Sequence, residues 1–230
     1  MFRPLVLLLC VLAVGLAACG GDDDDGSSGS AARDDAAPPT ERASKCAEVA
    51  QPKPKPDGGA KRPAEALDPK ATYDVVLQTS CGDITIRLDQ KTSPRTAASF
   101  AGLAEAGFFD GTVFHRIVPE FVIQGGDPTG TGTGGPGYST RDVPPQDATY
   151  TKGTVAMAKT QTEPPGTAGS QFYIVTAADA GLPPEYAVLG KVVKGQDVVD
   201  AIGRLGDPAS GDAGTPLQPV VVEKAIVRES

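Results

Sequence analysis

The chain has 230 residues, 29 of them acidic and 21 basic, which gives a net charge of −8 and an isoelectric point near 4.7. A surface this acidic repels phosphate backbones, so we expect no nucleic-acid partner. The single histidine, His115, has no cysteine near it in sequence, whereas a zinc site needs three or four converging ligands. Any Ser–His–Asp triad would also have to use His115, so the composition disfavours both metal and triad chemistry.

Residues 1–18 have the order of a secretory signal peptide, with Arg3 ahead of an apolar run from Leu5 to Leu16. The alternative is an uncleaved membrane anchor, but the run is shorter than the roughly 20 residues that usually span a membrane. The run ends in LAAC (residues 16–19), which resembles the lipobox of bacterial lipoproteins. That resemblance implies that Cys19 is lipidated and becomes the first mature residue. Since two acyl chains usually suffice for stable anchoring, we expect an extracytoplasmic protein held on the cell membrane by lipid.

Residues 19–71 differ in composition from the rest of the chain. Residues 20–71 contain no aromatic residue, seven prolines and an acidic run at 22–25. Such a segment buries too little apolar surface to offset its chain entropy, so it is predicted to be a disordered linker after the lipidated cysteine. The acidic run could instead be a binding tail, although a solvated stalk is the simpler interpretation.

Two cysteines are left for pairing once Cys10 leaves with the signal peptide and Cys19 is lipidated. Outside the cytoplasm, an even pair of cysteines predicts a disulfide, here between Cys46 and Cys81. This bond would join the distal part of the linker to the first hairpin of the folded domain.

Residues 72–229 are predicted to form one folded domain built mostly of strands. Alternating or β-rich runs occur at 73–78, 83–88, 112–117, 121–124, 154–158, 171–176, 188–193 and 220–228. The first two runs are joined by a hairpin turn at 79–82. Helices are expected at Ser93–Ala106, with Ser93 as N-cap and Pro94 in the first position, and at Asp197–Leu205. Many short strands with turn signals favour a single antiparallel barrel filled by its own side chains, so a site would lie on the outer wall.

The segment Gly130–Gly135 matches the G-x-G-x-x-G pattern of dinucleotide-binding proteins. That pattern binds a pyrophosphate only where a helix starts immediately after it. Here Pro136 and Gly137 follow, without helical periodicity, so the segment is predicted to be a glycine-rich surface loop.

The stretch Phe114–Tyr138 (FHRIVPEFVIQGGDPTGTGTGGPGY) resembles the signature of the cyclophilin-type peptidyl-prolyl cis–trans isomerases. The segments Val155–Ala158 and Gly169–Thr176 (GSQFYIVT) match further family motifs in the same order. The resemblance implies a closed eight-stranded antiparallel β-barrel capped by two helices. It also implies an active groove on the outer face, proline-containing polypeptides as substrates, no cofactor and no covalent intermediate. We expect a monomer.

By this resemblance Arg116 is the catalytic residue. The substrate-binding positions that it implies are Phe121, Val122, Gln124, Gly132, Ala158, Lys159, Thr160, Gln171, Tyr173, Leu182 and Tyr186. Gly181 stands where the family commonly has a large aromatic residue, and Tyr186 replaces a histidine at the pocket rim. Inhibition by cyclosporin, which depends on that aromatic residue, is therefore expected to be weak.

Isomerisation of an X–Pro bond would explain these residue types. An arginine aimed at the prolyl nitrogen would favour the twisted amide, and apolar residues would hold the proline ring. We therefore expect an isomerase that assists the folding of secreted or cell-envelope proteins. The main alternative is a non-catalytic module of the same fold that binds proline-containing segments as a chaperone or scaffold. His115 is expected to be a structural hydrogen-bonding residue and not a catalyst, because no proton is transferred. A Ser–His hydrolase is disfavoured because the chain has no G-x-S-x-G motif.

Overall fold

The structure is a computed structural model that describes residues 46–230. The predicted signal peptide, the lipidation site Cys19 and the part of the linker before residue 46 lie outside the described residues. Within 46–230, no helix is long and apolar enough to cross a membrane.

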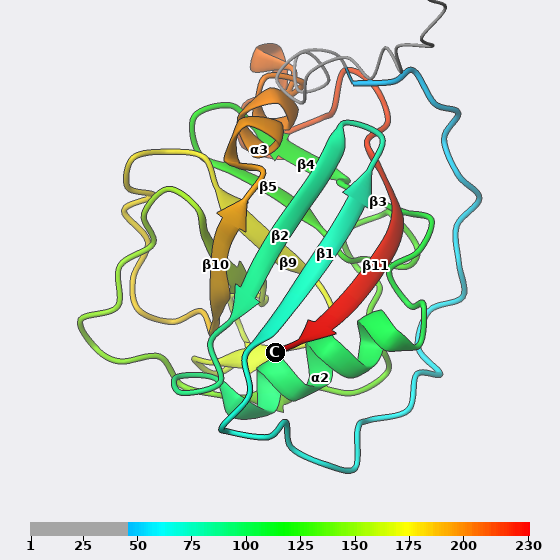
Figure 1. Ribbon diagram of the computed structural model, residues 1–230. Helices are drawn as coiled ribbons and strands as arrows, with labels where there is room; N and C mark the ends of the chain where they lie inside the picture. Colours follow the sequence, from blue (N-terminus) through cyan, green and yellow to red (C-terminus); the bar gives the residue numbers. More distant parts are fainter. Residues whose placement is uncertain (1–45) are drawn as a thin grey trace, which may run out of the picture. The chain divides into compact units, whose positions relative to one another are not determined.

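The domain is mainly β, as predicted, and consists of a nine-stranded antiparallel sheet with two short strands beside it (Figure 1). The order in the large sheet is β3-β11-β1-β2-β10-β7-β9-β5-β4, and β6 pairs with β8. The strands are β1 (Tyr73–Thr79), β2 (Gly82–Leu88), β3 (Thr112–Val113), β4 (Arg116–Val118), β5 (Val122–Gly125), β6 (Thr140–Arg141), β7 (Thr154–Met157), β8 (Thr167–Ala168), β9 (Phe172–Val175), β10 (Val188–Lys194) and β11 (Val221–Glu229).

The expectation of a closed eight-stranded barrel is wrong. The sheet has nine strands and is curled but open, with β3 and β4 as its two edges. The predicted single strand at 112–117 explains the difference, because the structure divides it at Phe114–His115. Its first half pairs with β11 and its second half with β5, so the two edges are joined by the chain and not by a ladder of hydrogen bonds.

Two α-helices lie at opposite ends of the sheet, and both were predicted to within a few residues (Figure 1). They are α2 (Pro94–Glu105) and α3 (Gln196–Gly203), and a short 3-10 segment, η1 (Pro208–Ala213), follows them. Ser93 holds the N-cap position of α2 but makes no capping hydrogen bond. The backbone N–H of Thr96 donates instead to Asp142 Oδ2 at 2.7 Å, an acceptor 46 residues away that no local pattern could identify.

The sheet has two apolar faces because alternate side chains point in opposite directions. The inner face holds the main core, in which Phe172 packs edge-on against Phe100, Phe109 and Phe114. A second, smaller cluster covers the outer side of β5, β7 and β9; its buried members are Val122, Tyr150, Ala156, Tyr173 and Val175. The predicted outer-wall site lies over this second cluster.

Residues 46–71, which we call the N-terminal arm, form an extended segment without helix or strand (Figure 1, blue to cyan). The arm is packed on the domain, whereas composition predicted disorder over 19–71. The predicted disulfide Cys46–Cys81 is present, and Ala47 N–H donates to Ser80 O at 2.8 Å. Further along, Pro63 packs so closely on α2 that a Cβ at Gly102 would lie 2.6 Å from its ring. The arm is thus ordered by long-range contacts, which its own composition does not reveal.

Candidate active site

The register of four neighbouring strands assembles the centre of the site. Arg116 in β4 pairs with Gln124 in β5, Gln124 pairs with Tyr173 in β9, and Tyr173 pairs with Ala156 in β7. Directly paired residues point to the same face of a sheet. This row therefore brings the guanidinium, the amide and the tyrosine ring onto the outer face.

The Arg116 guanidinium is held from two sides. Its Nε donates to the backbone oxygen of Asp212 at 3.0 Å, and Nη1 lies 3.5 Å from Gln124 Oε1. Its Cζ lies 5.9 Å from the centre of the Phe121 ring, within the range of a cation–π contact. Burial lowers the pKa of Arg116 and the nearby charge of Asp212 opposes this change, but an arginine stays protonated at neutral pH. The site thus holds a permanent, oriented positive charge.

Two glutamines connect Arg116 to the glycine-rich loop. Gln124 Nε2 donates to Gln171 Oε1 at 3.0 Å, and Gln171 Nε2 donates to the backbone oxygens of Gly132 and Gly134, both at 2.9 Å. This chain of amides fixes which end of each side chain carries the oxygen. Gln124 consequently turns an acceptor toward Arg116 and limits the directions that the guanidinium can take.

A cavity of about 190 Å³ lies directly beside Arg116. It is lined by Arg116, Phe121, Val122, Gln124, Ala158, Lys159, Tyr173, Leu182 and Tyr186. All nine are residues that the sequence analysis assigned to the site. Its floor is the apolar outer-face cluster and one wall carries the guanidinium, so the cavity suits a small apolar ring next to an amide.

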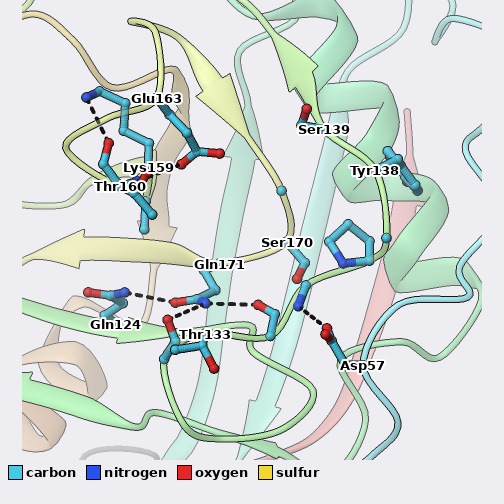
Figure 2. Close-up of a pocket in the computed structure, with 17 residues that line it drawn as sticks. Asp57, Gln124, Thr133, Tyr138, Ser139, Lys159, Thr160, Glu163, Ser170 and Gln171 are labelled. Atoms are coloured by element: carbon cyan, nitrogen blue, oxygen red, sulfur yellow. Dashed lines mark hydrogen bonds between the residues drawn. The ribbon is translucent and has the colours of Figure 1, made fainter.

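A second cavity of about 390 Å³ adjoins the first and shares Gln124, Ala158 and Lys159 with it (Figure 2). The other three predicted positions, Gly132, Thr160 and Gln171, line this second cavity. The structure therefore gathers all twelve predicted positions around two adjoining cavities, while the roles assigned to them stay predictions.

The glycine-rich loop is shaped by one buried carboxylate, that of Asp127, which has no exposed surface. It accepts hydrogen bonds from the backbone N–H groups of Thr129 at 2.7 Å and Gly134 at 3.2 Å, and also from Gly132. Burial raises the pKa of Asp127, but these hydrogen bonds outweigh it and hold the pKa below its usual range. A surface loop was predicted here, and the structure shows that Asp127 gives it a fixed form.

His115 lies beside this loop, with its ring 3.7 Å from the position a Cβ would take at Gly132. Burial lowers its pKa, Asp127 opposes this, and the charge of Arg116 adds to it, so the ring is neutral at pH 7. The expectation that His115 makes structural hydrogen bonds is wrong for the described residues, because neither of its buried ring nitrogens has a hydrogen-bond partner within residues 46–230.

Two departures from the family pattern change the rim of the first cavity. A Cβ at Gly181 would meet no atom within 4 Å, so the position of the usual aromatic residue is open space. Weak inhibition by cyclosporin stays a prediction. Tyr186 packs edge-on against Tyr173, with ring centres 5.7 Å apart. The ammonium of Lys159 lies 5.4 Å from the Tyr186 ring and 3.0 Å from Glu185 Oε2, so its charge is already paired.

Sequence analysis missed the support beneath Arg116. Besides the bond from Asp212, Gly214 O accepts a hydrogen bond from Ile117 N–H at 2.7 Å. Gly214 has φ +63°, and a Cβ there would lie only 2.8 Å from Arg116 Cγ. A glycine is compatible with a left-handed turn at position 214, but nothing in the sequence connects Gly214 with Arg116, about a hundred positions earlier.

Residues 46–230 contain no group of three or more His, Cys, Asp or Glu side chains that could hold a metal ion. The described residues around the site offer amides, a guanidinium and apolar rings. This set of groups is suited to holding a peptide.

Comparison with known proteins agrees with this geometry. The model of the cyclophilin type peptidyl-prolyl cis-trans isomerase family matches residues 74–227. Peptidyl-prolyl cis-trans isomerase A of Mycobacterium tuberculosis is 38% identical over 177 residues, covering 69% of this chain and 94% of that protein. Peptidyl-prolyl cis-trans isomerase B of Streptomyces anulatus is 39% identical over 169 residues, with coverages of 66% and 94%.

A solved structure gives the same answer for the fold. The crystal structure of a cyclophilin type peptidyl-prolyl cis-trans isomerase from Cryptosporidium parvum has a TM-score of 0.61 and 28% identity, covering 69% of this chain and 99% of that one. A second crystal structure of that protein, in the presence of the dipeptide Ala-Pro, has a TM-score of 0.60. The chain therefore belongs to the cyclophilin-type peptidyl-prolyl cis-trans isomerases.

Proposed function

We propose that this protein accelerates cis–trans isomerisation of X–Pro bonds in secreted or cell-envelope proteins, and so assists their folding. The observation that carries the catalytic part is the position of Arg116, which is held by Asp212 and Gln124 at the wall of an apolar cavity. The extracytoplasmic, lipid-anchored setting is supported by the sequence of residues 1–19.

The chemistry needs no bond to be broken. Resonance in the amide opposes rotation with a barrier of about 18–20 kcal/mol. The barrier falls when the prolyl nitrogen becomes pyramidal and no longer shares its lone pair with the carbonyl group. A guanidinium proton aimed at that nitrogen stabilises the twisted state more than the planar one, which is how a preorganised donor lowers a barrier.

The site divides this work among its residues. The proline ring occupies the first cavity, against Phe121, Val122 and Leu182. The Gln124–Gln171 pair holds Arg116 in direction and offers polar groups to a substrate carbonyl. Removing about 5–7 kcal/mol from the barrier would speed rotation by some four to five orders of magnitude, since each 1.36 kcal/mol is a factor of ten.

Peptide turnover with Arg116→Ala tests the catalytic role. We expect kcat/KM on an Ala-Pro peptide to fall about a hundredfold, equivalent to roughly 3 kcal/mol of lost transition-state stabilisation, while the thermal unfolding midpoint stays close to that of the wild type. An active wild type with an equally active variant would overturn the mechanism. A wild type that binds the peptide without turnover would favour the alternative, a proline-peptide-binding chaperone or scaffold of the same fold.

Cell fractionation tests the setting. In a bacterial host, the wild type should collect in the membrane fraction and Cys19→Ala should appear in the soluble fraction. This follows because two acyl chains at residue 19 would be the attachment to the bilayer. Equal membrane association of both proteins would contradict the lipid anchor.

A further inference from the structure

The N-terminal arm forms part of the wall of the second cavity, although it lies outside the segment that matches the isomerase family. Asp57 of the arm lines this cavity together with the glycine-rich loop (Figure 2). The family match begins only at residue 74. Asp57 thus lies outside the residues that the family model matches and yet reaches the groove.

The position of Asp57 is fixed by contacts on both sides of it in the chain. Its Oδ1 accepts a hydrogen bond from Gly135 N–H at 2.8 Å, and the backbone N–H groups of Gly58 and Ala60 donate to Gly135 O at 2.9 Å and Pro136 O at 3.1 Å. The arm therefore pairs along the glycine-rich loop.

A half-buried lysine, Lys55, holds the arm just before Asp57. Lys55 Nζ donates to the backbone oxygens of Gly107, Phe108 and Asp110 at 3.0, 2.6 and 3.0 Å, which satisfies all three of its protons. Lys55 does not line the second cavity. It can therefore be changed to loosen the arm without altering the cavity lining itself.

The second cavity is lined by two carboxylates, while the Arg62 guanidinium lies behind its lining, hydrogen-bonded to Ser139 O at 2.7 Å. Asp57 and Glu163 lie on opposite sides of it in Figure 2. Among residues 46–230, the only lysine in its lining is Lys159, which is paired with Glu185 at 3.0 Å and has a side chain that is 3% exposed. Two carboxylates thus face a cavity whose one ammonium group is neutralised.

We propose that Asp57 is a specificity-determining residue that makes the second cavity favour a lysine or arginine side chain close to the proline of the substrate. This inference rests on the proposed function, in which the proline ring fills the first cavity. The two cavities meet along Ala158 and Lys159, the segment that by family resemblance pairs with the residue before proline. The basic residue is therefore placed one or two positions before the proline.

The effect should be modest and salt-dependent because Asp57 is exposed. Exposed charge pairs contribute up to about 1 kcal/mol, which is up to roughly a fivefold preference, and ions screen them over about 10 Å at 0.1 M salt. We expect kcat/KM to be about two- to fivefold higher for a lysine peptide than for a glutamate peptide at low salt, and the ratio to approach one at 1 M NaCl.

The test uses acetylated peptides with lysine, alanine or glutamate at each of the two positions before proline. Isomerisation is measured by NMR exchange, so that no coupling protease adds its own preference. Asp57→Asn should reduce the lysine-to-glutamate ratio toward one, with kcat/KM on the alanine peptide as the uncharged reference for each protein. Glu65→Gln, the same charge change elsewhere on the arm, should keep the wild-type ratio, because Glu65 does not line the second cavity.

Lys55→Met tests the arm as the positioning element. It removes three hydrogen bonds outside the cavity, so it should lower the charge preference toward that of Asp57→Asn while the alanine peptide is still turned over. A wild-type ratio of one at low salt, or an unchanged ratio in Asp57→Asn, would overturn the proposal. If the wild type turns over none of the peptides, the proposed function fails, and the same peptides in a fluorescence binding assay still decide the charge preference.

Discussion

Two neighbouring rows of residues cross the same four strands and have opposite uses. The inner row, Ile117, Ile123, Ile174 and Val155, is entirely apolar and has no exposed surface. The outer row is Arg116, Gln124, Tyr173 and Ala156, each one position away in the chain. Because side chains alternate along a strand, the rigid inner row positions the outer row without contacting a substrate. The packing of the inner row therefore fixes the positions of the side chains in the site.

The strongest loss of stability is expected from a change in the inner row. Ile123→Ala should lower the free energy of unfolding by about 2–5 kcal/mol, since it removes a fully buried side chain and leaves a cavity. Urea unfolding followed by circular dichroism measures this. The neighbouring change Gln124→Ala is the matched control: it should cost less than about 1 kcal/mol but reduce peptide turnover, because Arg116 loses a bond that directs it. Equal stability losses in the two variants would contradict the division between the rows.

An intermediate effect concerns the loop that follows β5. Asp127→Asn should lower the free energy of unfolding by about 1–3 kcal/mol at pH 7, because several buried hydrogen bonds to a charged acceptor are weakened. The folded pKa of Asp127 is depressed, so its stabilisation is present above the unfolded-state value of about 3.9 and is lost as the pH falls through the folded pKa. The difference between wild type and variant should therefore shrink below pH 4. A constant difference from pH 7 to pH 3 would show that the carboxylate charge is not the cause.

The weakest effect is expected in the outer row, at Tyr173. The Tyr173 hydroxyl is buried without a hydrogen-bond partner within residues 46–230, and burial raises its pKa. Tyr173→Phe should therefore leave stability unchanged or raise it by up to about 1 kcal/mol, and should leave kcat/KM on an Ala-Pro peptide unchanged. A fall in kcat/KM with normal folding would instead assign the hydroxyl a contact with the substrate.

Local sequence patterns predicted most of the elements in the domain. Alternation and turn residues located β1, β2 and their hairpin, and Pro94 and Gly107 delimited α2 closely. The alternation of apolar and polar residues does not, however, show where a strand changes its pairing partner. The run 112–117 reads as one strand, and only its pairing with β11 at one end and β5 at the other shows that it is two edges of an open sheet.

Most residues around the site could be named from the amino-acid sequence, since the motifs at 114–138, 155–158 and 169–176 contain eight of the twelve predicted positions. The residues that support and extend the site became visible only in the folded structure. Asp212 and Gly214 hold Arg116 from a distant turn, Asp142 caps α2, and the N-terminal arm brings Asp57 to the groove. The reason is the distance in sequence between the interacting residues. Strand alternation and motif spacing depend on residues that are close together in the chain. A hydrogen bond or a close approach between segments a hundred residues apart exists only once the chain is folded.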